Sequence, residues 1–162
     1  MSATKFVKYG DRGFWVYDII LGVFVKHLVD TIEATGYSRA PFLDEALCTW
    51  RLAPFLDIGF PFEKSWTALQ RQNVISCIEE VCSRLATRDV IPMDEIVRWS
   101  FGGESRLFHR GLKEVRTSVV VELGSAIVAL LRNELPRAPK GEAWFFTGNG
   151  RSTIRMQPSW EG

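Results

Sequence analysis

Aromatic and β-branched residues gather in short runs near the start of the chain, and this pattern predicts a β-hairpin. Residues 5–9 and 14–17 have strand character, and residues 10–13 between them contain the glycines and the aspartate of a tight turn. The next residue after the second run, Asp18, is of a type that caps helices.

A second hairpin is predicted from residues 142–147 and 151–156. The Asn149-Gly150 pair between them is typical of a two-residue hairpin turn, because both turn positions need a positive φ. In that register Phe145 is opposite Ile154 and Trp144 is opposite Arg155. Adjacent residues of a strand point to opposite faces. The register therefore places Trp144, Phe146 and Arg155 together on one face.

Between the hairpins the apolar positions recur with the period of a helix. The pattern predicts helices over residues 18–35, 41–52, 64–86, 92–100 and 117–135. Gly36 fits the position after the first helix, and Pro41 fits the first turn of the second. Two prolines and a glycine in residues 53–62 argue against a regular element there.

These elements predict an α+β fold in which four to five helices pack with a small antiparallel sheet formed by the N- and C-terminal hairpins. A chain of 162 residues is the usual size of one domain, so we expect a single globular domain over residues 1–162. The three cysteines form no CxxC pair and are interpreted as reduced thiols of a cytoplasmic protein.

The charge of the chain is almost balanced. It has 20 basic and 19 acidic residues, a formal net charge of +1, and the two kinds are interleaved. This balance argues against nucleic acids and anionic membranes as partners, since a nucleic-acid binder usually carries a basic stripe. The longest apolar run is broken by Lys26 and His27, and a membrane span needs about 20 apolar residues.

The abundance of aromatic residues, 6 Trp and 11 Phe, indicates contact surfaces more than chemistry. If one face of the C-terminal hairpin is core, the other exposes Trp144 and Phe146 beside Arg155, and Trp and Arg are enriched at binding hot spots. The alternative is that helices cover both faces. Residues 55–62 are a second candidate surface, with Asp57 and Phe60; the alternative is an apolar loop folded over the core.

Adjacent acidic residues such as Asp44 and Glu45 diverge by about 100° on a helix, so they cannot jointly flank one bond. They fit a solvated helix face or a contact with a basic partner.

An enzyme reading would use a carboxylate with His27 or His109, as in a small hydrolase or transferase. No nucleophile motif, phosphate-binding loop or zinc-ligand spacing accompanies these histidines. We therefore expect a protein that is not an enzyme and has no metal and no cofactor.

The run AWFFTGNG at residues 143–150, after a helix that ends ALLRNELP at residues 129–136, resembles small bacterial immunity proteins of polymorphic and contact-dependent inhibition toxin systems. The resemblance implies a cytoplasmic inhibitor that neutralises a cognate toxin domain by tight stoichiometric binding. Many immunity proteins against nucleases are strongly acidic, and the balanced charge of this chain departs from that pattern. The alternatives are the small hydrolase or transferase, and a single-stranded nucleic-acid-binding module in which Trp144 stacks on bases among Arg137, Lys140, Arg151 and Arg155.

Overall fold

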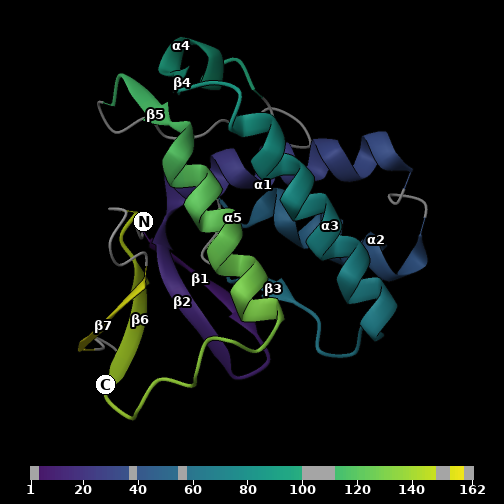
Figure 1. Ribbon diagram of the computed structural model, residues 1–162, viewed down its shortest axis with the longest axis vertical. Helices are drawn as coiled ribbons and strands as arrows, with labels where there is room; N and C mark the ends of the chain where they lie inside the picture. The colour runs from purple at the N-terminus through teal and green to yellow at the C-terminus, as the bar shows by residue number, and fades with distance from the viewer. Residues whose placement is uncertain (1–3, 37–39, 55–57, 100–111, 149–153, 159–162) are drawn as a thin grey trace.

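The computed structural model describes residues 4–36, 40–54, 58–99, 112–148 and 154–158. Figure 1 shows a sheet on one side of the molecule and a group of helices on the other. Along the chain the elements are β1 (Thr4–Tyr9), β2 (Arg12–Tyr17), α1 (Asp18–Thr35), α2 (Pro41–Leu52), β3 (Phe60–Phe62), α3 (Ala68–Leu85), β4 (Val90–Pro92), α4 (Met93–Ile96), β5 (Glu114–Arg116), α5 (Thr117–Leu131), β6 (Glu142–Phe146) and β7 (Ile154–Pro158). The predicted α+β class is therefore confirmed.

The two predicted hairpins join into one sheet with the strand order β3-β1-β2-β6-β7. β1 pairs with β2 and β6 with β7 in antiparallel fashion. The hairpins meet where β2 runs parallel to β6, through the pair Trp15 and Phe145. β3 also runs parallel to β1. The sheet is thus mixed, and the prediction of a purely antiparallel sheet was wrong because it considered only pairing within each hairpin.

β3 lies in the segment where prolines and glycine were expected to exclude a regular element, and that prediction was wrong. Pro61 is tolerated because β3 is an edge strand, where one missing backbone donor costs little. The indole Nε1 of Trp50 donates a hydrogen bond to the carbonyl oxygen of Pro61 at 2.8 Å. A helix side chain therefore satisfies the backbone of this edge.

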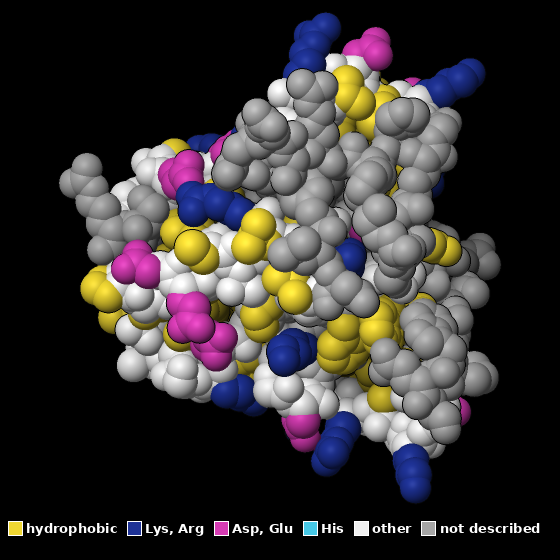
Figure 2. Space-filling model, turned by 180° about the vertical axis from the view of Figure 1, so that it is seen from behind, with side chains coloured by type: hydrophobic (Ala, Val, Ile, Leu, Met, Phe, Trp, Pro, Cys, Tyr) yellow, Lys and Arg dark blue, Asp and Glu magenta, His cyan; other side chains and the backbone are white. Residues whose placement is uncertain are grey.

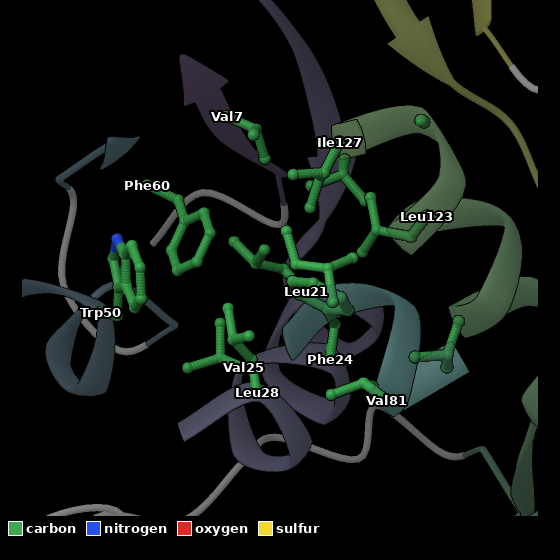
Figure 3. Close-up of a cluster of buried hydrophobic side chains, with 14 of the residues drawn as sticks. Val7, Leu21, Phe24, Val25, Leu28, Trp50, Phe60, Val81, Leu123 and Ile127 are labelled. Atoms are coloured by element: carbon green, nitrogen blue, oxygen red, sulfur yellow. The ribbon is translucent and has the colours of Figure 1, made fainter. Parts of the chain in front are cut away.

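The helices pack on one face of the sheet. α1 and α5 contact β1, α3 packs against both α1 and α5, and α2 packs against α1 and β3. Figure 3 shows side chains of the sheet (Val7), of α1 (Leu21 and Phe24) and of α5 (Ile127) in one cluster, with Trp50 beside Phe60 at one end. These side chains belong to one continuous cluster that contains nearly all the buried hydrophobic residues of the described part of the chain.

Burial alternates along the first hairpin. Val7, Tyr9, Phe14 and Val16 are buried toward the helices, whereas the alternate positions of β1 and β2 are partly or fully exposed, with the exception of the buried Gly13. Alternation of this kind marks an antiparallel pair that is covered on one face only. We call the face away from the helices the outer face.

The helix boundaries follow local signals. α1 spans Asp18–Thr35, and Gly36 has a φ of 80°, as predicted, but the N-cap is Tyr17 and Asp18 is a buried first residue. α3 begins at Ala68, later than predicted, because Thr67 and Gln70 form a capping box there. α5 ends at Leu131, before the predicted residue 135. α4 is only Met93–Ile96, shorter than the predicted 92–100.

None of the helices in the described part of the chain is long and apolar enough to span a membrane.

Candidate functional site

The C-terminal hairpin is paired one residue out of the predicted register. Phe146 is opposite Ile154, Trp144 is opposite Met156, and Phe145 is opposite Arg155. A shift of one residue exchanges the two faces of a strand. Among the described residues, the pair Phe146 and Ile154 is the one nearest to the turn.

Phe146 is therefore buried and not a surface contact, contrary to the prediction. Its exposed fraction is 4%, and its ring lies 6.3 Å from the ring of Phe14 in the core. Trp144 is partly buried against the core, and its Nε1 donates a 2.9 Å hydrogen bond to the carbonyl oxygen of Pro136. Arg155 is located here only by its backbone register opposite Phe145.

In the second predicted surface, residues 55–62, the predicted contact residue Phe60 is also not exposed. Phe60 is fully buried in β3 and packs against Trp50 at a ring distance of 5.3 Å. This is the alternative in which the segment folds over the core. Asp57 lies outside the described residues.

Asp44 and Glu45 are exposed on α2, as expected for a solvated helix face. In Figure 1 α2 lies on the opposite side of the molecule from β6 and β7. The structure therefore does not bring these acids together with Trp144, and the predicted contact residues do not form one surface.

A different set of aromatic side chains does share a surface. Phe6 of β1 is paired with Trp15 of β2, and Trp15 is paired with Phe145 of β6, so all three lie on the outer face. Each is partly exposed, and the rings of Phe6 and Trp15 are 5.1 Å apart. We call these three residues the aromatic row. Tyr17, also on the outer face, is 59% exposed.

A groove of about 450 Å³ lies beside the aromatic row. Phe6, Trp15, Ala138 and Ala143 are among the residues that line it. We call it the aromatic groove. Seen from behind the view of Figure 1, the surface carries a hydrophobic patch with basic and acidic side chains below it (Figure 2). The volume of the aromatic groove is within the range of sites that hold a side chain or a small ligand.

The wall that contains Ala138 is held in place by three hydrogen bonds. Arg12 Nη1 donates to the carbonyl oxygen of Leu135 at 3.4 Å, and Trp144 Nε1 donates to that of Pro136. The backbone N–H of Glu142 donates to the carbonyl oxygen of Pro139 at 3.0 Å. The indole of Trp144 thus helps to hold the wall of the groove in place.

Among the described residues, two acidic and two basic side chains line the aromatic groove. Asp11 and Arg137 form an exposed ion pair with 3.5 Å between Oδ2 and Nη1. Lys8 and Glu142 line the groove as well, and within the described residues neither has an ion-pair or hydrogen-bond partner for its side chain. As far as the described residues show, the groove therefore has an apolar floor and one ion pair, with Lys8 and Glu142 not paired to each other or to another side chain.

His27 is placed as a packing residue. Its Nδ1 is 2.8 Å from the carbonyl oxygen of Val23, and its ring meets the edge of Trp99 at 5.4 Å. Burial lowers the pKa of His27 below its ordinary value. Asp30, the expected orienting carboxylate, is held by Lys26 at 2.6 Å. His27 does not line the aromatic groove; His109 lies outside the described residues.

The cysteines are free thiols. Burial raises the pKa of Cys77 and of Cys82, so both are poor nucleophiles at neutral pH. In the described part of the chain, no group of three or more His, Cys, Asp or Glu side chains could hold a metal ion.

Comparisons with protein-family models, with curated proteins and with solved structures gave no match for this chain.

Proposed function

We propose that this protein is a binding inhibitor of another protein, and that the aromatic row and the aromatic groove form its contact surface. The observation that carries the proposal is a row of partly exposed aromatic rings on the sheet face opposite to the one on which α1 and α5 pack. Aromatic residues surrounded by charged ones are the usual composition of a binding hot spot.

The surface is also rigid, which favours tight binding. Phe6, Trp15 and Phe145 project from paired strands, and the opposite faces of these strands are anchored in the core. Side chains fixed before binding lose little conformational entropy when a partner orders them. An inhibitor that works by stoichiometric occupation needs this kind of pre-formed surface.

The partner that we propose is the toxic domain of a cognate bacterial toxin, so the protein would act as an immunity protein in the cytoplasm. The support is the resemblance of residues 129–136 and 143–150 to such proteins, together with the aromatic contact surface. Inhibition would follow from covering or distorting the active site of the toxin.

Binding of single-stranded nucleic acid is the second candidate, because aromatic rings on an open sheet can stack on bases. The charges favour the protein partner. The groove contains Asp11 and Glu142 beside Lys8 and Arg137, and Arg137 is already paired with Asp11. Acidic groups in the groove would repel a phosphate backbone.

The test begins with a tagged pull-down from the native host and identification of any stoichiometric partner that remains at high salt. The cognate toxin domain is then titrated against the wild type and the Trp15→Ala variant by calorimetry. We expect Trp15→Ala to weaken binding by more than about tenfold, since hot-spot aromatics contribute about 2 kcal/mol or more.

The matched control is Leu69→Ala, which removes another exposed apolar side chain, on α3, and leaves the sheet unchanged. Circular dichroism and thermal unfolding establish that both variants are folded. Equal toxin affinity for the two variants would reject the aromatic row as the contact surface. Salt-sensitive binding of oligo(dT) without any protein partner would favour the nucleic-acid function instead.

A further inference from the structure

The floor of the aromatic groove is shaped by Gly13. A Cβ at this position would lie 2.8 Å from Cζ of Phe6, so the ring of Phe6 extends from its own strand over Gly13 on β2. Trp15 follows on the same face of β2, and the rings of Phe6 and Trp15 are 5.1 Å apart. The two rings therefore form an apolar floor beside a residue that has no side chain.

Lys8 lies directly beside this floor. It is two residues from Phe6 on β1, so both side chains leave the strand on the outer face, with about 7 Å between their backbone positions. The residue opposite Lys8 is Gly13, and the parallel pairing of β2 with β6 places Ala143 next in the same row. Neither Gly13 nor Ala143 has a group that could neutralise the exposed ammonium of Lys8.

The other charged residues of the groove do not compensate the charge of Lys8. Asp11 is paired with Arg137, with 3.5 Å between Oδ2 and Nη1. Glu142 also lines the groove, but it comes one residue before Ala143 on β6, and strand alternation starts its side chain on the opposite face of the sheet. Among the described residues, the outer face of the groove therefore has one cation without an ion-pair partner beside two aromatic rings.

We infer that the aromatic groove binds a segment of the protein partner in which a carboxylate stands beside a large apolar side chain. The apolar side chain lies on Phe6 and Trp15, and the carboxylate reaches Lys8. The charge of Lys8 selects this occupant over a wholly apolar or a basic one. This inference rests on the proposed function and specifies the chemistry of the partner.

An extended segment provides this pair of groups. Alternate residues of an extended chain share one side and are about 7 Å apart, which is also the separation of Phe6 and Lys8 on β1. An acidic residue two positions from an aromatic one therefore meets both the floor and the ammonium.

A single-stranded nucleic acid also offers aromatic groups and negative charge, but it carries a phosphate at every nucleotide. Proteins that bind it follow the backbone with a positively charged groove. The described lining of the aromatic groove offers only Lys8 and an arginine that is already paired with Asp11. One carboxylate matches this supply of charge better than a phosphate backbone does.

The test uses the full ¹⁵N-labelled chain and four capped tripeptides: Asp-Ser-Trp, Asn-Ser-Trp, Lys-Ser-Trp and Asp-Ser-Ser. Chemical-shift changes report both the affinity and the location of binding. We expect Asp-Ser-Trp to bind about threefold more tightly than Asn-Ser-Trp, with shifts at Gly13 and Trp15, since exposed ion pairs are weak. Lys-Ser-Trp should bind less tightly than both, and Asp-Ser-Ser should show the need for the ring. Equal affinity for the acid and the amide peptide would overturn the inference.

A charge reversal at Lys8 makes the test sharper. We expect the Lys8→Glu variant to prefer Lys-Ser-Trp over Asp-Ser-Trp. The matched control is Lys113→Glu, which reverses another exposed lysine that does not line the groove and should keep the preference of the wild type. Thermal unfolding establishes that both variants are folded. A preference for the acidic peptide that persists in Lys8→Glu would reject Lys8 as its partner.

Removal of the acid of the groove gives an expectation of opposite sign. Asp11→Asn releases Arg137 from its ion pair and leaves a second cation at the groove. Asp-Ser-Trp should then bind about twofold more tightly, whereas the affinity for Asn-Ser-Trp should stay the same, since the gain is that of one exposed charge pair. Weaker binding of the acidic peptide to this variant would contradict the inference.

A variant that fills the groove separates binding there from binding elsewhere. Ala138→Leu places a larger side chain in the groove, and Ala86→Leu makes the same change at an exposed site after α3 that does not line the groove. We expect only Ala138→Leu to weaken the binding of Asp-Ser-Trp, by about tenfold, a loss typical of a blocked contact. Equal binding to the two variants would reject the groove as the site.

The failure of this inference can be distinguished from the failure of the proposed function. If the toxin domain binds through Trp15 and the peptides show no preference for the acid, the contact surface stands and the predicted segment is wrong. If the peptides bind as expected and no toxin domain binds, the groove chemistry stands and toxin inhibition is wrong. Binding of oligo(dT) that is tighter than that of Asp-Ser-Trp and is lost in Lys8→Glu would replace the protein segment by a nucleic acid.

Discussion

The close pairing of β1 with β2 requires a glycine at position 13. The nearest atoms to a Cβ at this position are the carbonyl oxygen of Val7, Cζ of Phe6 and Cα of Lys8. Two of these belong to the backbone of the paired strand, so they cannot move without breaking the pairing of β1 with β2. Sequence reasoning assigned Gly13 only to a turn, although the residue lies inside β2.

We expect Gly13→Ala to lower the free energy of unfolding by more than about 2 kcal/mol, because the added carbon overlaps backbone atoms. The control is Gly59→Ala, since a Cβ there meets only the carbonyl oxygen of Phe6 at 3.3 Å and should cost less than about 1 kcal/mol. Urea unfolding of both variants measures the difference. Equal stability of the two variants would show that β1 and β2 can pair without this close approach.

Among the elements, α3 has the best-defined start. The backbone N–H of Gln70 donates to Oγ1 of Thr67 at 3.1 Å, and the backbone N–H of Thr67 donates to Oε1 of Gln70 at 2.9 Å. These bonds satisfy two donors that the first turn of a helix leaves free.

Thr67→Ala removes the side chain that accepts from Gln70, and we expect it to lower the free energy of unfolding by about 1 kcal/mol. Thr67→Ser keeps a hydroxyl at the same place and should retain most of the stability. Thermal and urea unfolding of the two variants give the comparison. A serine variant as unstable as the alanine variant would show that the methyl group of Thr67, and not the cap, is responsible.

The elements that sequence predicted well are those with local signals. α1 ends where Gly36 allows a left-handed residue, and the first hairpin has its turn within a few residues. The C-terminal register failed because Asn149-Gly150 favours a two-residue turn, whereas burial of Phe146 against Phe14 sets the pairing. Contact between residues so far apart in sequence leaves no local signal.

The candidate site was missed for the same reason. Phe6, Trp15 and Phe145 are separate in sequence, and only the parallel pairing of β2 with β6 places them in a row. The predicted contact residues Phe60 and Phe146 are apolar enough for an interface, but their neighbours in space bury them. An aromatic residue does not show from its own sequence context which face of a sheet it occupies.

At the scale of the whole molecule, the stability should depend on pH through His27. Burial is the main cause that lowers the pKa of His27 below 6.5 in the folded protein, partly offset by its hydrogen bond to Val23 and by Asp30. Between the two pKa values the unfolded chain binds more protons than the folded one. Stability therefore falls as the pH drops through 6.5 toward the folded pKa.

Urea unfolding at several values between pH 8 and pH 5 measures this dependence, and we expect it to be smaller in the His27→Gln variant. Glu95, whose pKa the hydrogen bond from Arg88 lowers, loses its contribution only at pH values below 4.5, so it does not produce the same effect. An identical pH dependence in wild type and variant would assign the effect to another group.

The pairing of β2 with β6 also means that the five-stranded sheet can be completed only late in synthesis. The helices α1 to α5 are translated between β2 and β6, because Trp15 and Phe145 stand on either side of them in the chain. At a synthesis rate of about 5–20 residues per second this interval lasts on the order of ten seconds. During that time the nascent chain exposes the edge of β2 and one side of Phe14, the positions that β6 later covers. A ribosome-bound chain that ends before β6 therefore has no aromatic row and, on our proposal, no capacity to protect the cell.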